Sequence, residues 1–231
     1  MPSTNTDRAN TPLKIPAELA RALSGVTMPT AERSDLVESA APMGPPHFPD
    51  GAVARVDQVI NSTGSRLGYF RELLTELFCH FGSLDRLEGR RILELGATAN
   101  ALDALNLCER YGAQVTGIGA DLFYSDRPNL IGVKDYADYL KDRGASFDLI
   151  LASFSLYHCS GRESIAWALK ALRSGALLIR VSGGTEEGIT PKQAVEHDAT
   201  VVRDYKTLHA AGTPAANERR VQVLQKGALP S

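Results

Sequence analysis

Hydrophobic positions along the chain follow two different spacings. Between residues 65 and 81 the apolar side chains recur at steps of three and four, which predicts an amphipathic helix that packs on a sheet. From residue 91 onward, short apolar runs alternate with segments of helical spacing, and the run at 146–156 is continuous enough for a strand buried on both faces. This alternation predicts a parallel sheet covered by helices on both sides.

Five strands are expected in order, at residues 91–96, 113–119, 129–133, 146–156 and 175–183, followed by a closing strand at 219–227. Asn100 is a good N-cap for a helix that ends near Gly112, and a second helix is expected around residues 165–172. Residues 190–212 are predicted to be mainly helical. The fold class that we expect is α/β, a Rossmann-like three-layer α/β/α sandwich with a mostly parallel sheet, preceded by a helical N-terminal extension.

Eight of the twelve prolines lie in the first 50 residues, where proline's fixed φ and missing N–H favour an irregular arm. One short helix, at residues 16–25, is expected within it. The arm is either a flexible tail or a segment that lies across a binding cleft. The expected organisation is therefore an arm at 1–50, a helical cap or lead-in helix at 51–89, and the α/β domain at 90–228.

Composition narrows the function classes. The 231 residues carry a net charge of −2, which gives no general attraction to nucleic acid or anionic membranes. No apolar run reaches the length of about 18 residues that a membrane helix needs, and the N-terminus lacks the apolar centre of a signal peptide. The three cysteines, Cys79, Cys108 and Cys159, are scattered without metal-binding spacing. We expect reduced thiols, a cytoplasmic location and no metal site.

Four stretches resemble, in the right order, the motifs of class I S-adenosylmethionine-dependent methyltransferases. They are "ILELG", "AQVTGIGADL", "GVKDYADYL", and "SFDLILASFSLYH" followed by "ALKALRSGALLIRVSG", and the resemblance runs from about residue 64 to 227. It implies S-adenosylmethionine as cofactor. The implied cofactor-binding residues are Glu94, Gly96, Ala97, Thr98, Asn100, Gly119, Asp121, Asp135, Tyr136, Ser153 and Phe154.

The sequence departs from this family at two places. The family's turn is typically E/D-x-G-x-G-x-G, and here Thr98 and Asn100 replace two of the glycines that let the backbone approach the cofactor. The family's ribose-binding acid falls on Gly119, and Asp121 serves instead only if the strand end bulges. Asp135 matches the adenine-side acid without adjustment. The alternative is that both aspartates are solvated loop residues.

Candidate catalytic residues follow the fourth strand, because ligands bind at the carboxyl ends of strands in open parallel sheets. The segment contains Ser153, Phe154, Ser155, Tyr157, His158 and Cys159, of which Cys159 is less favoured as a nucleophile because no partner can be placed beside it. His158, with Tyr157 beside it, is the candidate base for removing a proton from a methyl acceptor. The alternative is that His158 only packs against or caps the next helix.

The leading prediction is a methyltransferase that uses S-adenosylmethionine on a small molecule, with secondary metabolism as its setting. The alternative is a methyltransferase-fold protein that does not methylate and acts as a binding or regulatory partner or as a cofactor-independent enzyme. A nicotinamide enzyme is a third option, but G-x-G-x-x-G is absent. The expected partner is a small-molecule substrate, without nucleic acid or membrane; a homodimer and the methyl acceptor stay open.

Overall fold

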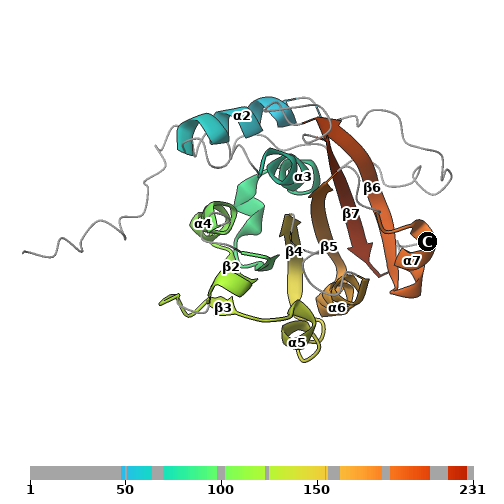
Figure 1. Cartoon of the computed structure of the whole chain (residues 1–231). Helices are drawn as coiled ribbons and strands as arrows, with labels where there is room; N and C mark the ends of the chain where they lie inside the picture. The colour runs from blue at the N-terminus through green and yellow to red at the C-terminus, as the bar shows by residue number, and fades with distance from the viewer. Residues whose placement is uncertain are drawn as a thin grey trace, which may run out of the picture.

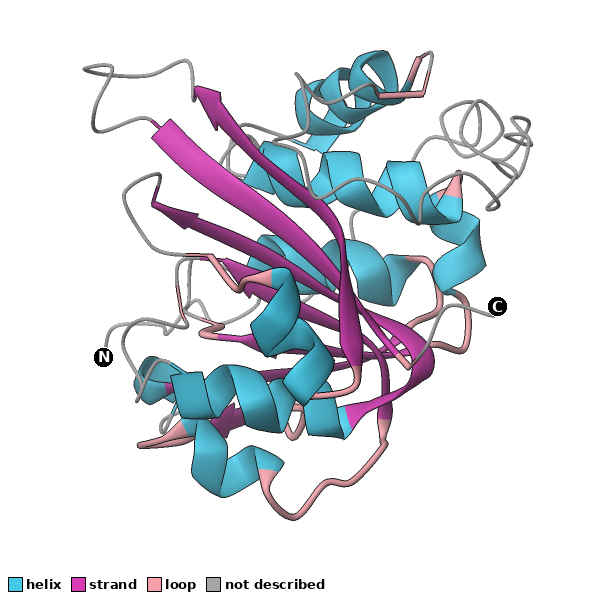
Figure 2. Cartoon of the chain, turned by 90° about the vertical axis from the view of Figure 1, so that its right-hand side faces the viewer, coloured by secondary structure: helices cyan, strands magenta, loops and turns pink. Residues whose placement is uncertain are grey.

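The computed structural model describes residues 48–49, 51–63, 70–97, 102–122, 125–153, 155, 162–183, 188–208 and 218–227. In these residues a twisted sheet runs between two layers of helices (Figures 1 and 2). The strands are β1 (Arg91–Leu95), β2 (Gln114–Gly119), β3 (Leu130–Gly132), β4 (Phe147–Ser153), β5 (Leu172–Gly183), β6 (Ala199–Leu208) and β7 (Glu218–Lys226).

The spatial order of the strands is β3-β2-β1-β4-β5-β7-β6. The pairs from β3 to β5 are parallel, whereas β7 runs antiparallel to both β5 and β6. The order reverses between β1 and β4, the kind of point at which open α/β sheets bind ligands beyond the carboxyl ends of their strands.

Alternating side chains of the strands enter two hydrophobic cores. Ile92 of β1 packs with the helices α2 (Ala52–Thr63), α3 (Arg71–Phe81) and α4 (Leu102–Arg110) on one face. Leu93 points to the other face, where α5 (Tyr136–Leu140), α6 (Arg162–Ala171) and α7 (Pro191–Glu196) pack (Figure 1). Both faces of the central strands are therefore buried, which explains their continuous apolar sequence.

Phe48 and helix α2, which precede the α/β domain, are joined to the side of the sheet that β5, β7 and β6 form. The ring of Phe48 packs edge-on against Tyr205 of β6, with ring centroids 5.7 Å apart, and the Arg203 guanidinium lies 5.2 Å from the Phe48 ring centre. Helix α2 packs on α3, which in turn lies on β5 and β7. The residues that precede the α/β domain thus complete one of its cores.

The structure confirms the predicted strands and the mostly parallel sheet, and it confirms helix in residues 71–81. The prediction of helix through residues 190–212 is wrong, because α7 ends at Glu196 and residues 199–208 form strand β6. Asp198 adopts a left-handed φ of 53°, which ends the helical path, and β-branched residues such as Thr200 and Val201 follow. The predicted arm helix at 16–25 lies outside the described residues.

Candidate functional site

The turn that follows β1 is fixed to the end of β2. Gly96 has a φ of 76°, a conformation that favours glycine. The N–H groups of Gly96 and Ala97 both donate to the carbonyl oxygen of Ile118, at 2.8 and 2.9 Å. Ala97 is fully buried. The backbone therefore crosses from β1 toward β2 as it leaves the sheet.

Three separate segments meet at Gly96. A Cβ atom on Gly96 would lie 2.1 Å from the Cβ of Ser155, which follows β4, and 2.9 Å from the Oη of Tyr136, at the start of α5. Ser155 and Tyr136 are both buried. No larger residue fits at position 96, and the predicted site residues Gly96 and Tyr136 are brought together with Ser155 at the reversal of the strand order.

The end of β2 is equally crowded. A Cβ atom on Gly119 would lie 2.3 Å from the carbonyl oxygen of Ala97. Pairing with β1 and β3 continues without a shift as far as Leu95 and Gly119, so the strand has no bulge. Asp121 lies in a 3₁₀ turn, η4 (Ala120–Leu122), directly after the strand. The strand pairing shows no bulge up to Gly119, and the ribose contact of Asp121, which the sequence made conditional on a bulge, stays a prediction.

Glu94 is a buried acid on β1. Its exposed fraction is 1%, and burial raises its pKa to about 8. The side chain is therefore protonated at neutral pH and can donate a hydrogen bond. Glu94 lies beside Leu151 of β4 in the sheet, and Ser153 follows two residues later on the same face.

Several buried polar atoms near the carboxyl ends of β1 and β4 have no hydrogen-bond partner in the protein: Glu94 Oε2, Ser153 Oγ and Ser155 Oγ. Most buried polar groups in folded proteins are hydrogen-bonded, so a group of unpartnered atoms needs an explanation. Their place, at the reversal of the strand order, is the place where a bound ligand supplies such partners. Among the described residues they are the strongest indication of a ligand site.

Asp135 and Tyr136 begin helix α5 just beyond β3. Asp135 is the N-cap, and its Oδ1 accepts a hydrogen bond of 2.9 Å from the N–H of Ala137. The N-cap function accounts for one carboxylate oxygen, and the second is not used by it. The aspartate therefore has a structural function in addition to the adenine contact that the sequence predicts.

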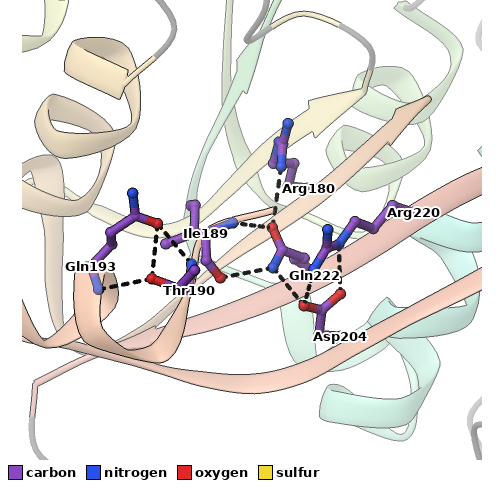
Figure 3. A network of polar contacts seen from close by, with 7 residues as sticks. All are labelled: Arg180, Ile189, Thr190, Gln193, Asp204, Arg220 and Gln222. Atoms are coloured by element: carbon purple, nitrogen blue, oxygen red, sulfur yellow. Dashed lines mark hydrogen bonds and ion pairs between the residues drawn. The ribbon is translucent and has the colours of Figure 1, made fainter. Parts of the chain in front are cut away.

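A second polar region lies on β5, β6 and β7, and its groups pair with one another (Figure 3). The side-chain amide of Gln222 accepts from Arg180 Nη1 and the Ile189 N–H, at 3.1 and 2.9 Å. It donates to the Ile189 carbonyl and to Asp204, at 3.0 and 2.9 Å. Arg220 contacts both oxygens of Asp204, at 2.8 and 2.6 Å. This network fixes the segment after β5 to the hairpin of β6 and β7.

On the opposite face, α3 is joined to the same hairpin by buried acids. Glu72 accepts from Arg219 at 2.8 Å, and both side chains are 7% exposed. Glu76 is fully buried and accepts from the hydroxyl of Tyr205 at 2.7 Å, with Arg203 Nε 3.4 Å away. These pairs hold α3 on the sheet and are structural.

Other predicted residues, Thr98, Asn100, Phe154, Tyr157 and His158, lie outside the described residues. The sequence did not single out the contact between Ser155 and Gly96 or the burial of Glu94. The alternation of Ser153 and Ser155 along the end of β4 is the sequence feature that could have indicated that Ser155 faces the site. In the part of the chain that the structure describes, no group of three potential metal ligands is found, and no helix is long and apolar enough to cross a membrane.

No family model and no curated protein sequence matches the chain. Solved structures do match. The Burkholderia thailandensis 1,6-didemethyltoxoflavin-N1-methyltransferase, with bound 1,6-didemethyltoxoflavin and S-adenosylhomocysteine, is 17% identical, covers 82% of this chain and 94% of its own, and has a TM-score of 0.50.

Two other structures are similar to this chain. A Galdieria sulphuraria protein assigned as a sarcosine dimethylglycine methyltransferase is 13% identical over 74% of this chain and 90% of its own, with a TM-score of 0.53. A chain from the Haloferax volcanii complex of the Trm112 methyltransferase activator with its assigned methyltransferase is 13% identical, over 79% and 97%, with a TM-score of 0.52. With the strand order and the reversed β7, these likenesses show that the fold is that of class I S-adenosylmethionine-dependent methyltransferases.

Proposed function

We propose that this protein is an S-adenosylmethionine-dependent methyltransferase that acts on a small molecule, in secondary metabolism. One observation carries the proposal. Glu94 on β1, Ser153 on β4 and Ser155 just after β4 carry buried polar atoms without hydrogen-bond partners, and Ser155 lies against Gly96, at the reversal of the strand order in a sheet that has the methyltransferase fold. These residues fit a ligand with several polar groups, because a protonated carboxyl and two hydroxyls offer both donors and acceptors.

The protein's own residues would bind and orient the cofactor. Gly96 lets the turn pass close beneath it, Glu94 donates a hydrogen bond as a neutral acid, and Asp135 accepts one through the oxygen that capping does not use. The bound cofactor supplies an electrophilic methyl group on its sulfonium. His158 and Tyr157, which follow β4, remain the proposed groups for taking the acceptor's proton.

A small-molecule acceptor agrees with two observations. The net charge of −2 gives no general attraction to nucleic acid. One structure of the same fold is a methyltransferase with bound 1,6-didemethyltoxoflavin. The cytoplasmic location belongs to the same proposal and is supported by the scattered cysteines, of which Cys79 and Cys108 are free thiols.

A second candidate function is a methyltransferase-fold protein that does not methylate. The observation that favours it is the end of β2, where the Ala97 carbonyl occupies the space of a side chain at Gly119. The two candidates differ in whether the site binds the cofactor at all.

Calorimetric titration with S-adenosylmethionine and S-adenosylhomocysteine separates them. Micromolar binding supports the enzyme, and no heat at millimolar ligand contradicts it. Asp135→Asn keeps the N-cap, because asparagine caps as well as aspartate, but removes the charge. We expect this variant to bind S-adenosylhomocysteine about tenfold more weakly, as for a lost charge-assisted hydrogen bond. Asp138→Asn, an exposed position one turn along α5, is the matched control and should bind normally.

A further inference from the structure

Glu94 is an acid in a place where its ionised form is poorly stabilised. Its exposed fraction is 1%, and its Oε2 is buried without a hydrogen-bond partner. We propose that the site binds its ligand only while Glu94 is protonated, with the carboxyl group donating a hydrogen bond to an acceptor atom of the ligand, so that affinity falls as pH rises. The inference rests on the proposed function, because it concerns the ligand of the same site.

The groups packed beside Glu94 bring no positive charge to it. In the sheet, Glu94 lies between Gly117 of β2 and Leu151 of β4. The titratable group that interacts with it from α4 is Cys108, which is fully buried. Burial, and then the charge of Glu94, raise the pKa of the Cys108 thiol to about 12, so this neighbour is neutral.

The stretches that follow β1 and β4 in the chain also contain no lysine or arginine. Residues 97–101 read ATANA, and residues 154–161 read FSLYHCSG. Their titratable side chains are Tyr157, His158 and Cys159, of which only His158 carries a positive charge when it is protonated. Burial alone raises the pKa of Glu94 to about 8, and the carboxyl group is therefore neutral at pH 7.

The protonation state of Glu94 decides what it can offer a ligand. A neutral carboxyl group donates a hydrogen bond, whereas an ionised one only accepts. A ligand that covers this place removes water from it, which disfavours the ionised form further, so binding raises the pKa of Glu94 above its value in the free protein. Affinity is then complete below about pH 8 and falls about tenfold for each pH unit above it, until the pKa of the complex is reached.

Calorimetric titration of the full chain with S-adenosylhomocysteine at several pH values tests the proposal. Glu94→Gln is measured in parallel, because glutamine does not ionise and the variant reports the titration of the ligand's own amino group. We expect the ratio of dissociation constants, wild type over variant, to rise about tenfold between about pH 6.5 and pH 9. Glu163→Gln, at an exposed position of α6, is the control and should keep the wild-type pH dependence.

The other outcomes separate this inference from the proposed function. A ratio that stays constant with pH would overturn the inference and leave the proposed function standing. A ratio that falls as pH rises would overturn it too, because an ionised Glu94 would then face a cationic group of the ligand. If S-adenosylhomocysteine binds at no pH, the proposed function fails and this inference fails with it.

Infrared difference spectroscopy of the wild type gives a second measurement, which does not depend on the folding of a variant. Near pH 9 the free protein holds Glu94 mostly as carboxylate, so ligand binding should replace a carboxylate band by the band of a protonated carboxyl group. Near pH 7 this difference should be small, because the carboxyl group is already protonated. Circular dichroism at each pH checks that the protein is folded. Binding near pH 9 without a gain of the protonated band would overturn the inference.

Discussion

The region around β1 and β4 and the hairpin of β6 and β7 differ in how completely their buried polar groups are hydrogen-bonded. On β1 and at the end of β4, polar atoms of Glu94, Ser153 and Ser155 are buried without hydrogen-bond partners in the protein. Along the hairpin, Gln222 makes four hydrogen bonds, and the buried acids Glu72 and Glu76 accept from Arg219 and Tyr205, although the second oxygen of Glu76 has no hydrogen-bond partner. Because an unpaired buried group costs stability, the first arrangement is expected where a ligand binds and the second where the fold is held.

The largest effect is expected at the ion pair that joins α3 to β7. Glu72→Ala removes the carboxylate to which the buried guanidinium of Arg219 donates, and breaking a buried ion pair costs about 3–5 kcal/mol. Urea denaturation measures the change in the free energy of unfolding. The control is Asp138→Ala, which removes an exposed ion pair with Lys141 and should cost less than about 1 kcal/mol. Equal losses of the free energy of unfolding in Glu72→Ala and Asp138→Ala would show that the buried ion pair stabilises the fold no more than an exposed one.

Glu94 should make stability depend on pH. Its folded pKa of about 8 lies above the unfolded value of 4.5, so the folded state binds the extra proton between these pH values. The destabilisation from this group is therefore absent below pH 4.5 and complete above pH 8. Glu94→Gln should differ from the wild type by less than about 1 kcal/mol near pH 5 and exceed its free energy of unfolding by about 4–5 kcal/mol at pH 8.5.

Denaturation curves at several pH values check this prediction. Glu163→Gln, on the exposed surface of α6, is the control and should follow the wild-type profile. A Glu94→Gln profile parallel to that of the wild type would show that Glu94 is charged in the folded protein.

Tyr205 and Tyr111 allow a buried hydroxyl that has a hydrogen-bond partner to be compared with one that has none. Tyr205→Phe removes the donor to Glu76 and leaves the carboxylate buried, which should cost about 1–3 kcal/mol. Burial, with Glu76 nearby, raises the pKa of Tyr205, so its hydroxyl is a donor throughout the working pH range. The hydroxyl of Tyr111 is buried without a partner, so Tyr111→Phe should change stability by less than about 0.5 kcal/mol. Thermal unfolding of both variants measures the difference.

The smallest change in stability is expected at Ser155. Ser155→Ala removes a buried hydroxyl without a partner and should leave the free energy of unfolding within about 0.5 kcal/mol. The same variant should bind S-adenosylhomocysteine about five- to tenfold more weakly by calorimetry. The control Ser83→Ala loses the cap of η3 (Leu84–Leu87) and should cost about 1 kcal/mol without a change in binding. If Ser155→Ala instead lowers the free energy of unfolding by more than this, the Ser155 hydroxyl stabilises the fold and does not serve the ligand site.

Much of the fold could be predicted, because strands buried on both faces have continuous apolar sequences that are unlike those of amphipathic helices. The segment 199–208 is the exception. Its charged residues Arg203 and Asp204 obscured the strand pattern, and both are half-buried in β6 beside partners from other elements, Glu76 for the first and Arg220 for the second. Such pairing joins residues far apart in the chain and leaves no local signal.

The sequence by itself determined the order of the elements, the glycine that the turn after β1 needs, and the absence of an acid at the end of β2, since each depends on local residue types. Only the tertiary structure decided the rest. It placed Ser155 and Tyr136 against Gly96, buried Glu94 enough to raise its pKa, and set the Ala97 carbonyl in the space beside Gly119. These are contacts between separate segments, whose distances are fixed only when the sheet assembles and excludes water.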